Sequence, residues 1–132
     1  MTAPAYLLDT NVCIDFLLGR SAVLADRMAG SFGALTVSAV TAGELRVGNR
    51  SSSDPVADGR RIDSFLTLLR VAPFDDAVAR VYADVVRQAG VRRNSFDRLI
   101  GTHALALGMV LVTRNPKDFA DIPGLKMEDW TR

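Results

Sequence analysis

The sequence has one cysteine, no long apolar segment and almost no net charge. Sixteen Lys and Arg residues stand against 15 Asp and Glu, so the bulk charge does not indicate a nucleic-acid-binding protein. Cys13 has no partner for an internal disulfide, which favours a reducing compartment. No apolar stretch reaches the roughly 20 residues of a membrane span, and no signal-peptide pattern opens the chain. We therefore expect a cytoplasmic protein without a membrane association.

Lysine is scarce too, with Lys117 and Lys126 as its only instances, so nearly all of the basic residues are arginines. Arginine is better suited than lysine to bidentate hydrogen bonding with phosphate oxygens, but a general preference for arginine codons explains the bias equally well. The length of 132 residues, with 48% hydrophobic and 23% charged residues, is typical of a globular protein. We expect a single domain over residues 1–132.

Short apolar runs alternate with helical patterns, which predicts an α/β fold. We expect a four- or five-stranded parallel sheet with helices on both faces. The predicted strands cover residues 5–8, 34–37, 71–74, 109–112 and 125–127. The predicted helices cover residues 10–18, 21–29, 40–48, 56–69, 75–89 and 96–107.

Asp9 directly follows the first apolar run, where parallel sheets place ligand-binding residues. The alternative is that Asp9 only caps the following helix. Ser38 and Thr113 also fall at predicted strand ends, and the Thr113 hydroxyl is suited to orienting a carboxylate. Asp15, in the helix after Asp9, is expected to face solvent.

Two further acids have competing explanations. Glu44 belongs either to the site or to a capping box with Thr41, in which its side chain returns to the helix start. Asp97 stands in the first turn of a predicted helix, where the helix dipole alone favours an acid. Three carboxylates in one cleft would repel one another unless a divalent cation lay between them. His103, about 240° from Asp97 around the helix, is expected in the core, as is Cys13.

The ordered set of motifs resembles the PIN-domain family, and within it the VapC-type toxins of bacterial toxin–antitoxin pairs. The resemblance covers essentially the whole chain, and no single motif is specific. Its parts are Leu7-Leu8-Asp9-Thr10-Asn11, Ser38 through Glu44-Leu45, Asp97 through Ala104, Leu111 through Phe119, and Ile122-Pro123-Gly124-Leu125 with Trp130.

The resemblance implies a three-layer α/β/α fold and an endoribonuclease that depends on Mg²⁺ or Mn²⁺. Asp9, Glu44 and Asp97 match the acidic metal-binding triad of the family, with Thr10, Asn11, Ser38 and Thr113 as supporting residues. Many relatives carry a fourth acid where this chain has Asn115, and Asp118 is the candidate to replace it. Gly101 stands where an alanine is common, a difference that we expect to be sterically neutral.

The implied reaction is hydrolysis of structured RNA, such as tRNA or rRNA, leaving a 5′-phosphate. The resemblance also implies a cognate antitoxin as partner and a homodimer. Basic residues around the expected site are candidate phosphate contacts, with solvated surface charge as the alternative for each: Arg46, Arg92, Arg93, Arg98, Arg114 and Lys117.

Two other functions remain open. One is a catalytically weak PIN scaffold that binds RNA or protein without cleavage. The presence of Asn115 in place of the fourth acid of many relatives favours this alternative slightly. The other is a receiver-like signalling domain, which requires adjacent acids after the first strand. Here Thr10 follows Asp9, and the acid pair Asp75-Asp76 follows the third strand instead.

Overall fold

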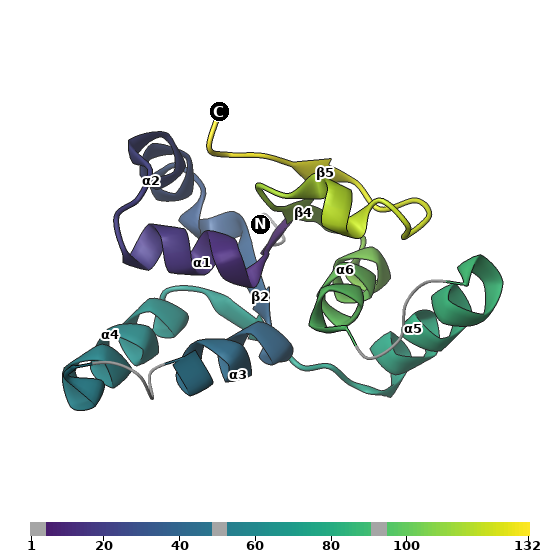
Figure 1. The fold of residues 1–132 in the computed structure, drawn as a ribbon, viewed down its shortest axis with the longest axis horizontal. Coiled ribbons are helices and arrows are strands. Elements are labelled where there is room, and N and C mark those ends of the chain that lie inside the picture. Colours follow the sequence, from purple (N-terminus) through teal and green to yellow (C-terminus); the bar gives the residue numbers. More distant parts are fainter. Residues whose placement is uncertain (1–4, 49–52, 91–94) are drawn as a thin grey trace.

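A computed structural model describes residues 5–48, 53–90 and 95–132, and it has a five-stranded parallel sheet at its centre (Figure 1). The strands lie in the order β3-β2-β1-β4-β5 and every neighbouring pair is parallel. Their bounds are β1 Tyr6–Leu8, β2 Leu35–Ser38, β3 Arg70–Ala72, β4 Val110–Val112 and β5 Met127–Glu128. The predicted α/β fold is confirmed, with five strands.

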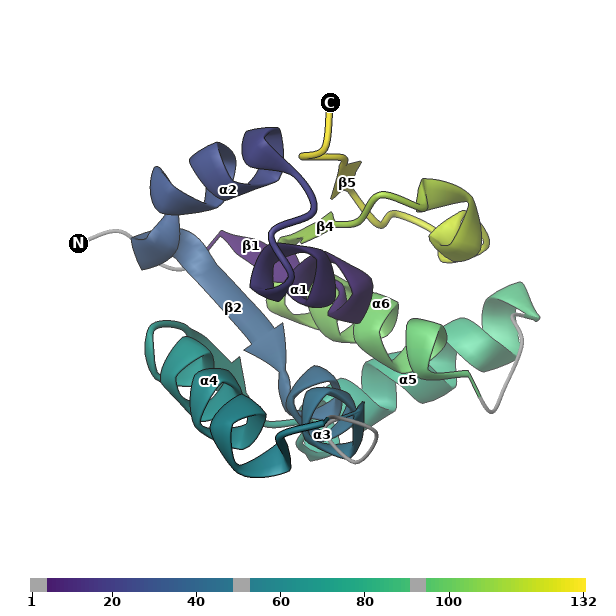
Figure 2. The ribbon, with the colours of Figure 1, turned by 60° about the vertical axis from the view of Figure 1, so that its left-hand side comes forward.

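Within the described ranges, six α-helices and two 3₁₀ turns connect the strands. On one face of the sheet, α1, α2, α3 and α4 contribute buried side chains to one hydrophobic cluster, whereas α6 and η3 form the cluster on the other face with α5 packed against α6 (Figures 1 and 2). The bounds are α1 Thr10–Leu17, α2 Ala22–Ala29, η1 Phe32–Ala34, α3 Ala39–Gly48, α4 Pro55–Thr67, α5 Asp76–Ala89, α6 Phe96–Leu107 and η3 Pro116–Phe119.

The central strands are buried on both faces. In β1, Leu7 packs with the α6 side of the core and Leu8 with the α1 side, because successive side chains of a strand point to opposite faces. Leu111 and Val112 of β4 divide in the same way. Trp130, near the C-terminus, is 1% exposed and joins the α1 side, so its apolar surface is used inside the chain.

Helix ends follow the local chemistry that the sequence displays. The side chain of Asp75 accepts a hydrogen bond from the Val78 amide at the start of α5. Gly90 and Gly108 end α5 and α6 with φ of 65° and 67°, a conformation that side-chain-bearing residues rarely adopt. The extents of the predicted helices therefore agree with the structure to within one or two residues at most ends.

The chain order places a switch point between β1 and β4. From β1 the chain builds outward through β2 and β3, and it then returns to the opposite side of β1 to form β4 and β5. In open parallel sheets, the carboxyl ends of the strands at such a reversal form the usual ligand site. Asp9 follows β1 and Thr113 follows β4, so both lie at this point.

Strand bounds differ slightly from the predictions. The third strand ends at Ala72 and not at residue 74, and the fifth is a two-residue strand that begins at Met127. No helix in the described residues is long and apolar enough to cross a membrane.

Candidate functional site

Asp9 is the best-defined residue at the switch point. It is only 3% exposed, and its Oδ2 accepts a 2.8 Å hydrogen bond from the hydroxyl of Thr113. Asp9 is the N-cap residue of α1, but its side chain makes no capping hydrogen bond. The carboxylate is therefore directed across the rim toward β4. The Thr113 hydroxyl thus bonds to a carboxylate as expected, and its role in a functional site stays a prediction.

Burial and a second acid disfavour the charged form of Asp9. Desolvation raises the pKa of the Asp9 carboxyl, and the negative charge of Asp97 raises it further. The Thr113 hydroxyl and the amides of Asn11 and Thr10 oppose that rise. The charge of Asp97 thus acts on Asp9 although β1 and α6 are distant in sequence.

Asp97 stands in the first turn of α6, at the helix end that approaches this rim. Its pKa is also raised, mainly by partial burial and then by the charge of Asp118, while Arg98 lowers it. Asp118 lies in η3 and is exposed. Charge interactions therefore link Asp97 to Asp9 and Asp118 to Asp97.

Glu44 reaches the same side of the molecule from α3, a helix in contact with both α1 and α6. Its Oε1 accepts a 2.7 Å hydrogen bond from the Thr10 hydroxyl, which also lies 2.9 Å from the hydroxyl of Thr41. The capping-box alternative is wrong, because α3 begins at Ala39 and Thr41 is already inside the helix. Thr10, next to Asp9, is instead the residue that connects Glu44 to the β1 rim.

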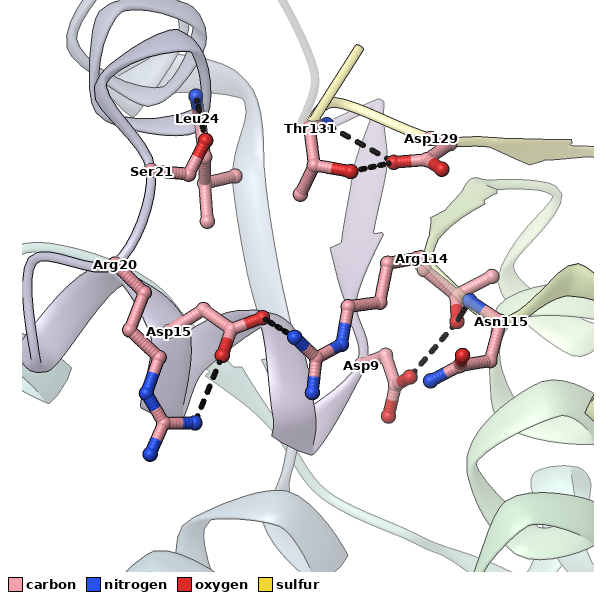
Figure 3. Close-up of polar contacts among 10 residues, drawn as sticks. Asp9, Asp15, Arg20, Ser21, Leu24, Arg114, Asn115, Asp129 and Thr131 are labelled. Atoms are coloured by element: carbon pink, nitrogen blue, oxygen red, sulfur yellow. Dashed lines mark hydrogen bonds and ion pairs between the residues drawn. The ribbon is translucent and has the colours of Figure 1, made fainter.

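The loop after β4 is folded onto Thr113. The backbone amide of Asn115 donates to the Thr113 hydroxyl at 3.0 Å, so this hydroxyl bonds to the loop and to Asp9 at once. Figure 3 shows the side chain of Asn115 directed toward the Asp9 carboxylate. The side chain of Asn115 therefore belongs to the same candidate site as the Asp9 carboxylate.

Two predicted core residues are confirmed. His103 is fully buried, with Nδ1 2.8 Å from the Ser38 hydroxyl and its ring edge-on to Phe74, and desolvation lowers its pKa. Ser38 also accepts a hydrogen bond from the Val40 amide, so its hydroxyl serves His103 and the start of α3. Cys13 is buried, and desolvation raises the pKa of its thiol well above the usual range, which makes it unreactive.

The predicted phosphate-binding residues fall into distinct groups. Arg46 pairs with Asp63 at the surface, 3.0 Å away. Arg98, with a side chain only 12% exposed, donates to Asp121 and to the carbonyl of Asp118, which leaves it little freedom to bind a substrate. Lys117 is exposed on η3. Arg92 and Arg93 lie outside the described residues.

The expectation that Asp15 faces solvent is wrong. Its side chain is 2% exposed and lies between two arginines from different parts of the chain (Figure 3). Arg20 Nη1 donates to Oδ1 at 3.1 Å, and Arg114 Nη1 lies 3.0 Å from Oδ2. The continuous apolar residues on both sides of Asp15 in α1 were the signal of its burial in the sequence, and its partner Arg114 follows ninety-nine positions later.

The donor atoms at the rim suit a hard divalent cation. Asp9, Asp97, Glu44 and Asp118 offer only carboxylate oxygens, the ligand type that Mg²⁺ prefers. Burial, and after it the charge of a neighbouring acid, raises the pKa values of Asp9 and Asp97, and a bound cation would favour their charged forms. Across residues 5–48, 53–90 and 95–132, however, no three acidic, histidine or cysteine side chains stand in an arrangement ready to hold an ion.

Comparison with known proteins agrees with this architecture. The PIN domain family matches residues 6–125. The "tRNA(fMet)-specific endonuclease VapC" of Shigella flexneri is 32% identical over 96% of this chain and 98% of its own length. "Ribonuclease VapC2" of Rickettsia felis is 28% identical over 96% of this chain and 98% of its own length.

Solved structures show the same fold. The DNA-bound VapBC complex of Salmonella typhimurium contains a chain that superimposes with a TM-score of 0.87, at 28% identity over 96% of this chain and 98% of that one. VapBC-1 from nontypeable Haemophilus influenzae gives a TM-score of 0.82 at 28% identity, covering 99% and 100% of the two chains. The receiver-like alternative is therefore wrong, and the chain belongs to the PIN-domain family, with VapC ribonucleases among its relatives.

Proposed function

We propose that the protein is a divalent-cation-dependent endoribonuclease that acts in the cytoplasm as the toxin of a toxin–antitoxin pair. The observation that carries this proposal is the buried Asp9, oriented by Thr113 and electrostatically coupled to Asp97 at the switch point. Support comes from the VapC relatives, whose names describe ribonucleases and a tRNA endonuclease. Structured RNA, either tRNA or rRNA, is the proposed substrate.

Asp9, Asp97 and Glu44 are the residues that would hold Mg²⁺ or Mn²⁺, with Asn115 and Asp118 at the edge of the site. A bound cation would activate water for attack on a phosphodiester and offset charge in the transition state. Thr113 fixes the direction of the Asp9 carboxylate, and Thr10 fixes that of Glu44. Cleavage by this route does not need the ribose 2′-hydroxyl and leaves a 5′-phosphate.

Substitution of Asp9 tests the activity. Asp9→Asn removes the charge with little change of shape, so it should abolish RNA cleavage, by at least about a hundredfold, while the far-ultraviolet circular dichroism spectrum stays unchanged. EDTA should have the same effect on the unmodified protein. Asp76→Asn, which removes an equally charged but exposed carboxylate from α5, should cleave normally. Full activity of Asp9→Asn, or activity in EDTA, would contradict the proposal.

A cognate antitoxin and a second copy of this chain are the proposed protein partners. The solved relatives are VapBC complexes, in which a VapC-like chain is present together with a partner. Expression of this protein alone should arrest growth, and co-expression of a small protein encoded beside it should relieve the arrest.

A PIN scaffold that binds RNA without cleaving it is the second candidate. The observation that favours it is the lack of a three-residue ligand group among the described residues, together with Asn115 in place of a family acid. A binder would shift the mobility of RNA without producing new 5′ ends. Sequencing of RNA ends after induced expression separates the two functions.

A further inference from the structure

We propose that Asp15 is a positioning residue, which holds Arg114 at the mouth of the acidic site so that its guanidinium binds a phosphate of the RNA backbone. The inference rests on the proposed function, because it takes RNA as the substrate. It assigns a role to a carboxylate outside the acidic group of Asp9, Asp97 and Glu44.

Asp15 differs from the other ion-paired acids in its burial. Its side chain is 2% exposed, whereas those of Asp63 and Asp76 are 67% and 81% exposed. An ionised carboxylate is retained in such a place only when cations compensate it. Two arginines do so here, and Arg20 alone already supplies a directed hydrogen bond to Oδ1. The other oxygen, Oδ2, is buried without a hydrogen-bond partner, and the Arg114 guanidinium is the cation beside it.

The position of Arg114 connects this pair to the site. It lies between Thr113, whose hydroxyl holds Asp9, and Asn115, whose amide bonds to that same hydroxyl. Figure 3 shows its side chain running from this loop to Asp15. The ion pair therefore ties the loop that carries Thr113 and Asn115 to α1, the helix whose N-cap residue is Asp9.

Arg114 keeps donors for a ligand. Its side chain is 42% exposed, and its contact with Asp15 Oδ2 is an ion pair that lacks the direction of a hydrogen bond. Within the described part of the chain, its guanidinium donates no hydrogen bond. Arg98, which is nearer to Asp97 in sequence, uses its donors on Asp121 and Asp118. A guanidinium with five N–H donors that is held on one side is preorganised for the two oxygens of a phosphate.

The direction in which the RNA affinity changes when Asp15 is substituted distinguishes a positioning role from a simple effect of its charge. Removal of an acid near a nucleic-acid site ordinarily strengthens RNA binding, because it lessens repulsion of the phosphates. If Asp15 positions Arg114, its removal should weaken binding instead. If Asp15 merely competes with RNA for Arg114, Asp15→Asn should strengthen binding.

The experiment measures the affinity of a short fluorescent RNA hairpin by anisotropy, over a range of salt concentrations. Every variant carries Asp9→Asn, which prevents cleavage during the measurement. We expect Arg114→Gln to weaken binding several-fold and to reduce the salt slope by about 0.7–1, the loss of one phosphate contact. Asp15→Asn should weaken binding too, and it should have no further effect when Arg114→Gln is already present.

The matched control is Arg80→Gln, which removes the same charge from an exposed pair on α5 and should leave the salt slope unchanged. Arg20→Gln removes the other partner of Asp15 and should also leave the slope unchanged. Melting curves verify the fold of each variant. If Asp15→Asn fails to fold, Asp15→Glu displaces the carboxylate at constant charge and should weaken binding in the same way.

Tighter binding by Asp15→Asn, additive effects of the two substitutions, or an unchanged salt slope in Arg114→Gln would overturn the inference. Cleavage of RNA by the unmodified protein is measured separately, with Mg²⁺ present. If it cleaves RNA but the binding results fail, only the role of Asp15 is wrong. If it does not cleave RNA, the proposed function is wrong, and the binding results still decide whether Asp15 positions Arg114.

Discussion

Single residues at the sheet rim show both what local sequence reveals and what it hides. The place of Asp9 at the sheet rim was predictable, because an acid that ends an apolar run marks the carboxyl end of a strand, and the hydroxyl of Thr113 marked the neighbouring strand end. Asp15 was not predictable. Its burial depends on Arg114, which folding brings from the other end of the chain. The ion pair, and with it the role of Arg114, is visible only in the structure.

The carboxylates of Asp9 and Asp97 should cost stability at neutral pH. Their pKa values are raised in the folded protein, so the charged forms are less favourable there than in the unfolded chain. The free energy of unfolding should therefore fall as the pH rises from the usual range of an aspartate through these raised values. Below that range both states are protonated and the penalty is absent.

Asp9→Asn should accordingly stabilise the protein without a metal. We expect a gain of about 1 kcal/mol at pH 8, typical of substitutions that relieve a strained functional site, and a smaller gain at acidic pH. The free energy of unfolding should increase less in Asp97→Asn, since Asp97 is more exposed than Asp9. Urea unfolding in EDTA at both pH values measures the difference. An equal gain from Asp76→Asn, whose carboxylate is exposed, would show that overall charge and not the site is responsible.

At the scale of elements, helices were easier to predict than their contacts. Gly90, Gly108 and Asp75 are local signals, and each ends or begins the helix that the sequence indicated. For Glu44 the sequence left a capping box with Thr41 open as an alternative to the site. The structure decides against it, because α3 begins at Ala39 and Ser38, the last residue of β2, accepts the hydrogen bond from the Val40 amide.

The contact between α6 and η3 is tighter than the sequence suggests. A Cβ at Gly101 would lie 2.4 Å from Cδ1 of Ile122 and 3.1 Å from Cδ1 of Phe119. Glycine therefore fits the packing of this chain as expected, whereas an alanine would require Ile122 to move. The side chains of η3 and the following turn occupy the space that an alanine would use.

Gly101→Ala should destabilise the protein despite the better helix propensity of alanine. Alanine gains about 1 kcal/mol in a helix interior, whereas overpacking costs about 1–3 kcal/mol, so we expect a net loss of about 1 kcal/mol. Ile122→Val removes the obstructing Cδ1 and should make Gly101→Ala neutral or stabilising in that background. Urea unfolding of the four proteins measures this coupling. Additive effects would show that Ile122 moves aside without cost.

At the scale of the whole molecule, the fold was predictable as a class but its site was predictable only through family resemblance. Strands of two to four residues carry little information about their neighbours, so the order β3-β2-β1-β4-β5 does not follow from local patterns. That order decides which strand ends meet. The proximity of Asp9 to Asp97 and the contact of Thr10 with Glu44 are its consequences.

Three separate parts of the chain supply the acids, and in the part of the chain that the structure describes they do not form a closed ligand group. Asp9 follows β1, Glu44 belongs to α3 and Asp97 to α6, and Glu44 is occupied by the hydroxyl of Thr10. A cation that attracts all three would join the two faces of the sheet across its rim. Binding of such an ion should therefore stabilise the whole fold and not only the loop after β4.

We expect Mg²⁺ or Mn²⁺ to raise the melting temperature of the protein, whereas Asp9→Asn and Asp97→Asn should show little or none of this increase. A ligand that binds only the folded state adds RT ln(1 + [L]/Kd), about 1.4 kcal/mol when its concentration is ten times Kd. Differential scanning calorimetry with increasing Mg²⁺ measures the shift without reference to activity. Asp76→Asn should retain the full increase, because its carboxylate lies on the surface of α5. The same increase in Asp97→Asn as in the unmodified protein would place the ion elsewhere.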